Sequence, residues 1–541
     1  MAEVTRLNFD EMMPLIEKAI ELCSFIAIDI EFTGLDLGSA GIDRIKLIDT
    51  LPERYQKLKI RATNMIPCQI GLSMFTNCPN DNSYSVEAYI FYVCPRKIGS
   101  VDKTFMCQLK FLSSYNFDFN KFLHDGIPYI NKKDQEKVLK ELKDGTLYAS
   151  HERLLDTETI RNIDSEINKL LEIPKKCNKK NEIDSQKFVI TLPIDKACHV
   201  FFQLNAIRRK YPSVWAYTKD NLIIVEKVSQ AEKKKLTSAY EDDIKTLRDF
   251  LGFTRVFKLL YTSCKPIVGH NFLLDLMLLY HHFYDDLPDS YVSFKEELDL
   301  LFPFVFDTKH IWLNMRKVKK LPNTPKHLAL QDLYIAFESP VGEMATLYQP
   351  SIKPSNCEKY LYNKFPHESG YDSFMTGCVF IKISHLLAME RYETPCMKPH
   401  MKSQSFKEHL KAISPFANKI MVAYSKIEYL NLNGEDPEPL VPNDLYISHK
   451  TNRSLTDVEL SKLLENYSLV EWKLVHRKRG AVIIIGNVKS YFDILKRFKD
   501  DPDYIVSVYN SKRILSVAFW VTAAVSSYFL AVLIYKKILK P

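Results

Sequence analysis

The sequence lacks several features that would assign it to a simple class. Its eleven cysteines include no Cys-x-x-Cys pair and are odd in number, which argues against a zinc site or a disulfide framework and favours a reducing compartment. The amino terminus, MAEVTRLNFDEMMPLIEKAIEL, has an amphipathic helical pattern but no apolar run, so no signal peptide is expected. A strong excess of one charge is also missing: 74 Lys+Arg against 66 Asp+Glu leave only +8, a mild bias that permits a polyanionic partner without indicating one.

The composition is that of a globular protein. The chain has 541 residues and a mass of 63.0 kDa, which at about 150 residues per domain suggests roughly three folded units. Apolar residues make up 46% and charged residues 26%, so the chain is too hydrophobic to be largely disordered.

The clearest single element is an apolar segment near the carboxyl end. Residues 514–535 (ILSVAFWVTAAVSSYFLAVLIY) carry no charge and would form a helix of about 33 Å, against a hydrocarbon core of about 30 Å. A buried core helix is the alternative, but it would need protein on every side. We therefore expect a single-pass tail anchor that leaves the rest of the chain on the cytosolic side. Basic residues flank it on both sides: Lys512, Arg513, Lys536, Lys537 and Lys540.

Strand and helix patterns alternate through most of the chain. Short apolar, β-rich runs at 23–29, 65–75 and 88–94 predict a three-strand meander that opens a mixed sheet. Helical patterning follows, and the alternation favours an α/β domain. The helical stretches are 241–261, 271–284, 329–337 and 372–390.

Two further regions differ from this core in residue composition or in the order of their predicted elements. Between about residues 150 and 235 the chain is rich in lysine and poor in aromatic residues, which indicates an insertion. Residues 445–509 read as strand, helix, strand, strand, helix, strand, the βαββαβ order of an RNA-recognition-type fold.

Three segments carry candidate catalytic groups. Asp29 and Glu31 are two residues apart at the end of an apolar strand, so both carboxylates face the same way. Asp275 follows Asn271 by four residues and is expected on the same face of an apolar helix, where an unpaired carboxylate is costly. The third segment is PHESGYDSFMTG, in which His367 precedes Asp372 by five residues. Taken singly, each also fits a structural role: a solvated strand end, a salt bridge or helix cap, a surface histidine.

Taken together, the motifs resemble those of the DEDD superfamily of 3′–5′ exonucleases, in the subgroup with a histidine in the third motif. The match is to the poly(A)-specific ribonuclease family and covers about residues 1–150 and 240–395. The motifs are DIEFTGL at 29–35, HNFLLDLM at 270–277, FDTKHI at 306–311 and HESGYDSFMTG at 367–377.

The resemblance implies an α/β fold with a ribonuclease-H-like core and a mixed sheet. The expected plan also has an inserted small domain, a degraded RNA-recognition-like βαββαβ domain and a carboxyl-terminal transmembrane helix. The corresponding ranges are 1–150 and 241–400 for the nuclease core, 151–240 for the insert, 415–510 for the RNA-recognition-like domain and 514–535 for the tail anchor.

The resemblance also implies an active site. Asp29, Glu31, Asp275 and Asp372 would hold two Mg²⁺ ions, with Mn²⁺ as an alternative, because hard cations take oxygen ligands and a metal pair stabilises the attacking and leaving oxygens at phosphorus. His367 would be the general base, since imidazole titrates near neutrality. The expected substrate-binding residues are Phe32, Leu35 and Asn271, with core packing as an open alternative for Phe32 and Leu35.

Two departures from the family pattern bear on RNA binding. The family's insert carries an Arg-x-x-x-His signature, whereas here Asp195 stands four residues before His199. In the RNA-recognition-like domain the third strand reads KRGAVIIIG, so aliphatic residues replace the aromatic residues that would stack bases. A protein-docking or structural role is favoured for this domain over base readout, and the basic run 476–479 contacts phosphates or simply faces solvent.

The anchored members of this family suggest a specific function. They imply a metal-dependent exoribonuclease that trims the 3′ ends of precursors of PIWI-interacting RNAs on the cytosolic face of the mitochondrial outer membrane. The implied partners are a single-stranded RNA 3′ end, a PIWI-type small-RNA carrier and a Tudor-domain scaffold, and a homodimer is left open. The alternatives are a membrane-tethered poly(A) deadenylase, a catalytically silent RNA or protein scaffold, and, for the location, the endoplasmic reticulum.

Overall fold

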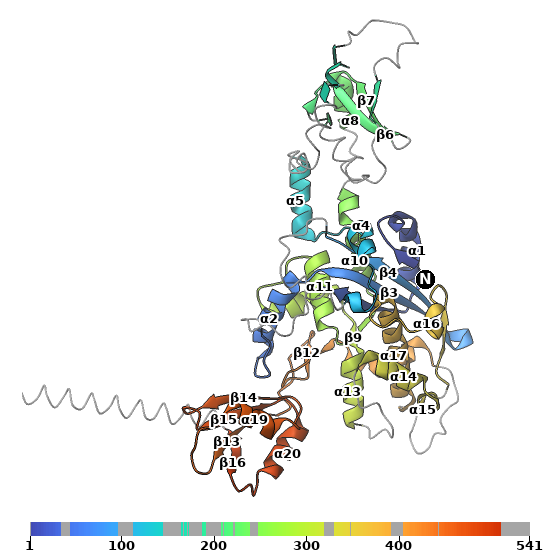
Figure 1. Ribbon diagram of the computed structural model, residues 1–541. Helices are drawn as coiled ribbons and strands as arrows, with labels where there is room; N and C mark the ends of the chain where they lie inside the picture. Colours follow the sequence, from blue (N-terminus) through green and yellow to red (C-terminus); the bar gives the residue numbers. More distant parts are fainter. Residues whose placement is uncertain are drawn as a thin grey trace, which may run out of the picture. The chain divides into compact units, whose positions relative to one another are not determined.

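The structure is a computed structural model of the whole chain (Figure 1). The longer described stretches are residues 2–33, 44–95, 112–143, 247–318, 329–346, 348–390, 404–441 and 443–509. Shorter described runs lie at 164–165, 167–169, 171–172, 187–190, 207–208, 210–219 and 222–237.

The nuclease core is built on a mixed sheet of seven strands in the described part of the chain. Strands β2, β3 and β4 form an antiparallel meander, which confirms the expected opening of the sheet. Strands β8 and β9 continue from β2 in parallel, and β1 and β10 each pair in parallel with β4. The strands are β1 (Ala2–Val4), β2 (Phe25–Phe32), β3 (Pro67–Cys78), β4 (Ser83–Tyr92), β8 (Ile267–Gly269), β9 (Val305–Asp307) and β10 (Ser351–Pro354).

Helix α17 (Ser369–Glu390) is the main helix packed against this sheet. Residues 373–385 are all buried, which suits a helix that has apolar residues on every side. The ring of Phe380 lies 4.9 Å from that of Phe25 in β2, within one continuous apolar core. Gly71 in β3 permits the close approach, because a Cβ there would lie 2.0 Å from the Ser369 carbonyl oxygen.

The remaining helices of the nuclease core surround the sheet and connect its strands (Figure 1). The expected helices at 271–284, 329–337 and 372–390 correspond to α11, α14 and α17. The other bounds are α1 (Phe9–Leu22), α2 (Leu51–Asn64), α4 (Phe119–Asp125), α10 (Thr254–Thr262), α11 (Leu273–Phe283), α12 (Tyr291–Leu301), α13 (Thr308–Val318), α14 (Leu330–Glu338), α15 (Pro340–Ala345), α16 (Lys359–Tyr362) and α18 (Phe406–Ile413).

A second compact unit comprises Pro128–Arg255 together with His282–Asp285. It contains helices α5 (Lys132–Lys143) and α8 (Gln230–Thr237) and an antiparallel sheet in the order β5-β7-β6. The Arg208 guanidinium lies 3.9 Å from the Trp215 ring centroid. Asp195 and His199 lie outside the described residues. The strands are β5 (Lys187–Ile190), β6 (Val214–Lys219) and β7 (Leu222–Lys227).

The RNA-recognition-like domain has the element order that the sequence predicts. Its four strands are antiparallel in the order β14-β15-β13-β16, and a short hairpin, β11 (Lys419–Met421) with β12 (Tyr429–Asn431), precedes it. Its core includes Ile447, Ile483 and Ile494. The elements are β13 (Asp444–His449), α19 (Asp457–Leu464), β14 (Val470–Val475), β15 (Gly480–Ile485), α20 (Val488–Arg497) and β16 (Tyr504–Tyr509).

The expected tail anchor at 514–535 falls outside the described residues. Among the helices that the structure does describe, none combines the length and the apolar character needed to cross a bilayer.

Candidate active site

Strand β2 supplies the first two carboxylates. Asp29 pairs opposite Gly71 and Glu31 opposite Gln69 of β3, so the two acidic side chains share one face of the sheet. The strand continues through both residues to Phe32, with an irregularity in register between Glu31 and Phe32. Both carboxylates therefore stand within the sheet rather than just beyond a strand end, and Glu31 is only 9% exposed.

The third carboxylate, Asp275, lies in the first turn of α11, which follows β8. The expectation that Asn271 shares a helical face with Asp275 is wrong. The helix begins at Leu273, and Asn271 precedes it with a left-handed backbone (φ +62°). Asn271 adopts this turn where its backbone N–H donates to the Asp307 carboxylate, at 2.9 Å.

The fourth carboxylate and the histidine come from the start of α17. Asp372 lies in its first turn, and His367 lies just before the helix with φ +62°. One ligand atom each of Glu31, His367 and Asp372 lies within 4.8 Å of the others. Residues more than 330 positions apart in the sequence therefore converge on one point.

Burial and mutual repulsion dominate the electrostatics of the cluster. Burial raises the pKa of Asp29 to about 7. The pKa of Glu31 is raised by burial and then by the charges of Asp29, Asp372 and Asp275. The pKa values of Asp275 and Asp372 are also raised by burial and by the charge of Asp29, although backbone hydrogen bonds from Ile30 and His367 oppose these shifts.

This donor set fits divalent cations. Four partly or fully buried carboxylates that raise each other's pKa values are costly to ionise alone, and hard cations prefer oxygen ligands of this kind. The imidazole of His367 lies beside Glu31 and Asp372. The structure thus brings together Asp29, Glu31, Asp275, His367 and Asp372, all five residues expected from the motifs.

His367 has a neighbour that the sequence did not indicate. The Tyr115 ring lies 4.1 Å from the His367 ring, at an interplanar angle of 57°, and restricts the orientation of the imidazole. Burial lowers the pKa of His367, so the neutral form persists to lower pH than in a solvated histidine.

Polar side chains on β3 fix the beginning of α17. The Gln69 side-chain oxygen accepts hydrogen bonds from the Ser369 backbone N–H, at 2.9 Å, and from its hydroxyl, at 3.0 Å. The hydroxyls of Ser73 and Ser373 lie 2.8 Å apart. These contacts place Asp372 beside Asp29. Each joins residues 300 positions apart, so no local sequence signal announces them.

The expected substrate-binding residues have separate outcomes. Phe32 is half-buried at the end of β2, directly after Glu31, and Asn271 forms the turn before α11. Leu35 lies outside the described residues.

The basic run 476–479 forms the connection between β14 and β15, where three successive residues, His476 to Lys478, have positive φ angles.

Known proteins resemble this chain along most of its length. The family described as CAF1 family ribonuclease matches residues 4–380. The pre-piRNA 3′-exonuclease trimmer of Bombyx mori is 31% identical over 551 residues, covering 99% of each chain. The poly(A)-specific ribonuclease PNLDC1 of Mus musculus is 27% identical over 516 residues, covering 94% of this chain and 93% of that protein. The poly(A)-specific ribonuclease PARN of Homo sapiens is 30% identical over 490 residues, covering 84% and 72%.

The matched region contains all the motif residues, from Asp29 to Asp372. The sheet, the helix that follows β8 and the start of α17 bring these residues to one place, as an acidic nuclease site requires. The chain therefore belongs to the CAF1 family of ribonucleases and is a 3′–5′ exoribonuclease of the DEDD type.

Proposed function

We propose that this exoribonuclease trims the 3′ ends of precursor PIWI-interacting RNAs at a cytosolic membrane surface. One observation carries the proposal: the Bombyx protein named as a pre-piRNA 3′-exonuclease matches this chain over 99% of the length of both. The active-site cluster of Asp29, Glu31, Asp275, His367 and Asp372 supplies the chemistry.

In this proposal the four carboxylates hold two Mg²⁺ ions, with Mn²⁺ as the alternative. Bound metal ions would stabilise negative charge on the attacking and leaving oxygens at the 3′-terminal phosphodiester. Asp29 and Glu31 are fixed by the sheet, while Asp275 and Asp372 stand at the beginnings of two helices. The ligands thus sit on regular elements rather than on loops.

His367 acts as the general base on the attacking water. Its imidazole lies beside Glu31 and Asp372, and burial lowers its pKa so that it is neutral and able to accept a proton at pH 7. Tyr115 holds the ring from one side. Phe32, Leu35 and Asn271 contact the terminal nucleotides.

We propose a cytosolic, membrane-anchored location on the strength of the sequence of residues 514–535. The uncharged segment with basic flanks suits a single-pass tail anchor in the mitochondrial outer membrane, with the endoplasmic reticulum as the alternative. Anchoring raises the local concentration of an RNA 3′ end presented there by a PIWI-type carrier on a Tudor-domain scaffold.

The second candidate is a membrane-tethered poly(A) deadenylase. It is favoured by the names of the relatives from mouse and human, both called poly(A)-specific ribonucleases. The two candidates share the active site and differ in the tail that they remove.

An assay on two RNAs separates them. Full-length protein in detergent, with Mg²⁺, is given one 3′-hydroxyl RNA of mixed sequence and one that ends in oligo(A). Trimming predicts equal shortening of both, and slower attack when the terminal ribose carries a 2′-O-methyl group. Rapid degradation of oligo(A) alone would establish the deadenylase. The Glu31→Gln variant should be inactive on both RNAs, whereas Glu21→Gln, at an exposed position in α1, should retain activity.

A further inference from the structure

The centre of the open face of the RNA-recognition-like sheet packs against one residue that precedes α2 of the nuclease core. Alternate residues of β15, including Ile483 and Ile485, pack into the domain's own core. Val482 and Ile484 face the other way, yet they are only 7% and 5% exposed, because they pack in one apolar cluster with Leu47. Leu47 precedes α2 of the nuclease core and is fully buried. We call Leu47, Val482 and Ile484 the docking cluster.

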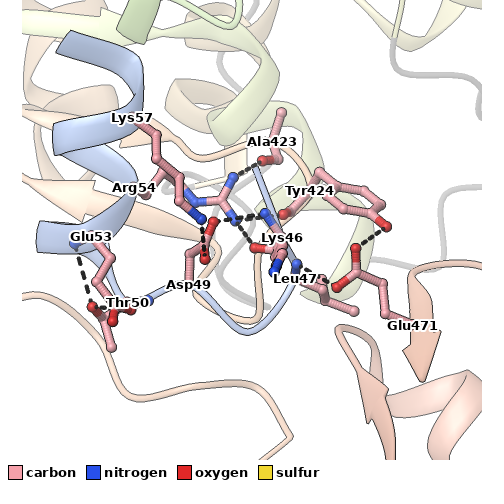
Figure 2. A network of polar contacts seen from close by, with 10 residues as sticks. All are labelled: Lys46, Leu47, Asp49, Thr50, Glu53, Arg54, Lys57, Ala423, Tyr424 and Glu471. Carbon is pink, nitrogen blue, oxygen red and sulfur yellow. Dashed lines mark hydrogen bonds and ion pairs between the residues drawn. The ribbon is translucent and has the colours of Figure 1, made fainter. Parts of the chain in front are cut away.

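A polar network lies around Leu47, one member of this docking cluster (Figure 2). The Glu471 carboxylate on β14 accepts hydrogen bonds from the Leu47 backbone N–H and the Tyr424 hydroxyl, both at 2.9 Å. The buried Arg54 guanidinium donates to the carbonyl oxygens of Lys46 at 2.9 Å, Ala423 at 3.0 Å and Tyr424 at 2.7 Å. Segments from the nuclease core, the hairpin region and the RNA-recognition-like domain are therefore tied at one point.

The segment before α2 is held rigidly in this network (Figure 2). The Asp49 carboxylate accepts from the Lys46 backbone N–H at 2.7 Å and pairs with Lys57 at 2.6 Å. Thr50 and Glu53 form a capping box at the start of α2. Gly486 leaves room for Leu47, because a Cβ at that position would lie 2.8 Å from the Leu47 Cδ1 atom. The contact is thus built by complementary features on both sides.

The network continues toward the active site along the backbone from Tyr424 back to Met421. Tyr424 and Ala423 follow Met421, whose backbone N–H donates to Asp307 Oδ2 at 3.0 Å. Asp307 is fully buried, and its other partners include the backbone N–H groups of Asn271 and Phe272, at 2.9 and 3.1 Å. These two residues form the turn into α11, which carries Asp275 in its first turn.

We propose that the RNA-recognition-like domain is a positioning domain for the nuclease site. Its sheet face and Glu471 dock on Leu47 and Tyr424, hold the segment that ends at Met421, and through Asp307 keep the turn before α11 in place. Glu471 and Asp307 are positioning residues in this proposal, which rests on the assignment of Asp275 to the metal site. The centre of the sheet face is occupied by Leu47 and is not a base-stacking surface.

The test compares Glu471→Ala and Tyr424→Phe with a matched control, Glu465→Ala, which changes an exposed glutamate in the same domain. Full-length protein in detergent is used throughout, and thermal unfolding verifies that each variant is folded. The measurements are kcat and KM on a 3′-hydroxyl RNA and the dissociation constant of Mn²⁺ without RNA. We expect Glu471→Ala to lower kcat and to weaken Mn²⁺ binding about three- to tenfold, which lies within the range in which residues remote from a ligand modulate coupling. Tyr424→Phe should have a smaller effect, and neither variant should change KM more than about twofold.

Reciprocity supplies an independent readout. If docking favours metal binding, metal binding must favour docking by the same factor. Amide hydrogen exchange at Leu47, whose N–H bonds to Glu471, should slow when Mn²⁺ is added to the wild-type protein. This slowing should disappear in Asp307→Asn, where the link is interrupted. Combining Glu471→Ala with Asp307→Asn should cost less Mn²⁺ affinity than the sum of the single changes.

Two outcomes would overturn the proposal. A rise in KM for Glu471→Ala with unchanged kcat and Mn²⁺ affinity would make the domain an RNA-binding surface. Unchanged values of all three in folded Glu471→Ala and Tyr424→Phe would make the docking independent of the active site. Failure of the underlying site assignment is distinguishable, since Asp275→Asn would then retain Mn²⁺ binding in a protein with intact docking.

Discussion

The single carboxylate of Asp307 and the four-carboxylate cluster of the candidate site differ in what surrounds them. Asp307 accepts hydrogen bonds from five backbone N–H groups, those of Asn271, Phe272, Lys309, His310 and Met421. In the cluster, burial raises the pKa values of Asp29, Glu31, Asp275 and Asp372, and the charges of other members raise those of all but Asp29 further. A satisfied buried carboxylate serves the fold, whereas a cluster of mutually repelling carboxylates is maintained at a cost and serves a ligand.

The largest expected effect comes from a change within the cluster. Glu31→Gln should lower kcat about 10³-fold or more, because metal ions contribute several kcal/mol of transition-state stabilisation and each 1.4 kcal/mol corresponds to about tenfold in rate. The same variant should unfold at an equal or higher temperature without metal, since repulsion from three carboxylates is relieved. A large loss of metal-free stability would place Glu31 in the same class as Asp307.

The next effect concerns the base beside the cluster. His367→Ala should lower the rate about 10²–10⁴-fold at neutral pH, with partial recovery at higher pH as hydroxide supplies the nucleophile. In the wild-type protein, burial lowers the pKa of His367, so the acid-side loss of activity should fall below pH 6.5. A pH–rate profile with saturating Mg²⁺ measures both. Equal profiles for the two proteins would remove His367 from the reaction.

A change in Asp307, the carboxylate whose hydrogen bonds are satisfied, should lower the stability of the folded protein. Asp307→Asn turns an amide N–H toward backbone donors and should lower the free energy of unfolding by about 2–4 kcal/mol, the cost of leaving buried polar groups unpaired. Denaturant unfolding measures the change. Asp493→Asn, at an exposed position in α20, is the matched control and should be neutral. Unchanged stability of the Asp307 variant would end the distinction between Asp307 and the cluster.

The last expected effect is a pH dependence of the metal-free protein, spread over several pH units. Burial raises the pKa of Asp29 from 3.8 to about 7, so between these values the folded state keeps a proton that the unfolded chain has lost. Stability without metal should therefore fall as pH rises from about 4 to 7, by at most about 1.4 kcal/mol per pH unit. Mg²⁺ should reverse the trend.

The buried His409 gives the stability of the metal-free protein an additional pH dependence, which the measurement must control for. Burial and the neighbouring His385 lower the pKa of His409 to about 3, so this group costs stability as pH falls below 6.5. Comparing wild type with Asp29→Asn cancels the His409 contribution, because both proteins retain it. Identical pH dependence in the two proteins would contradict the raised pKa of Asp29.

Much of the fold follows from local patterns in the sequence. The alternation in 23–29, 65–75 and 88–94 predicts the meander of β2, β3 and β4, and the element order of residues 445–509 is observed as expected. These predictions succeed because strand and helix periodicities depend on near neighbours. The expectation for Asn271 fails because the contact that decides its conformation is not with a near neighbour. The buried Asp307 carboxylate, 36 residues further along the chain, holds Asn271 in a turn ahead of the helix.

The sequence alone identified the five residues of the candidate site, because their motifs are short and ordered along the chain. Only the tertiary structure placed Tyr115 against His367, Gln69 against Ser369 and Leu47 against the sheet of the RNA-recognition-like domain. The partners in these contacts are between about 250 and 440 residues apart. Such pairings depend on how the elements pack in three dimensions and leave no periodic trace in the sequence, so the supporting structure around the chemistry was decided by packing.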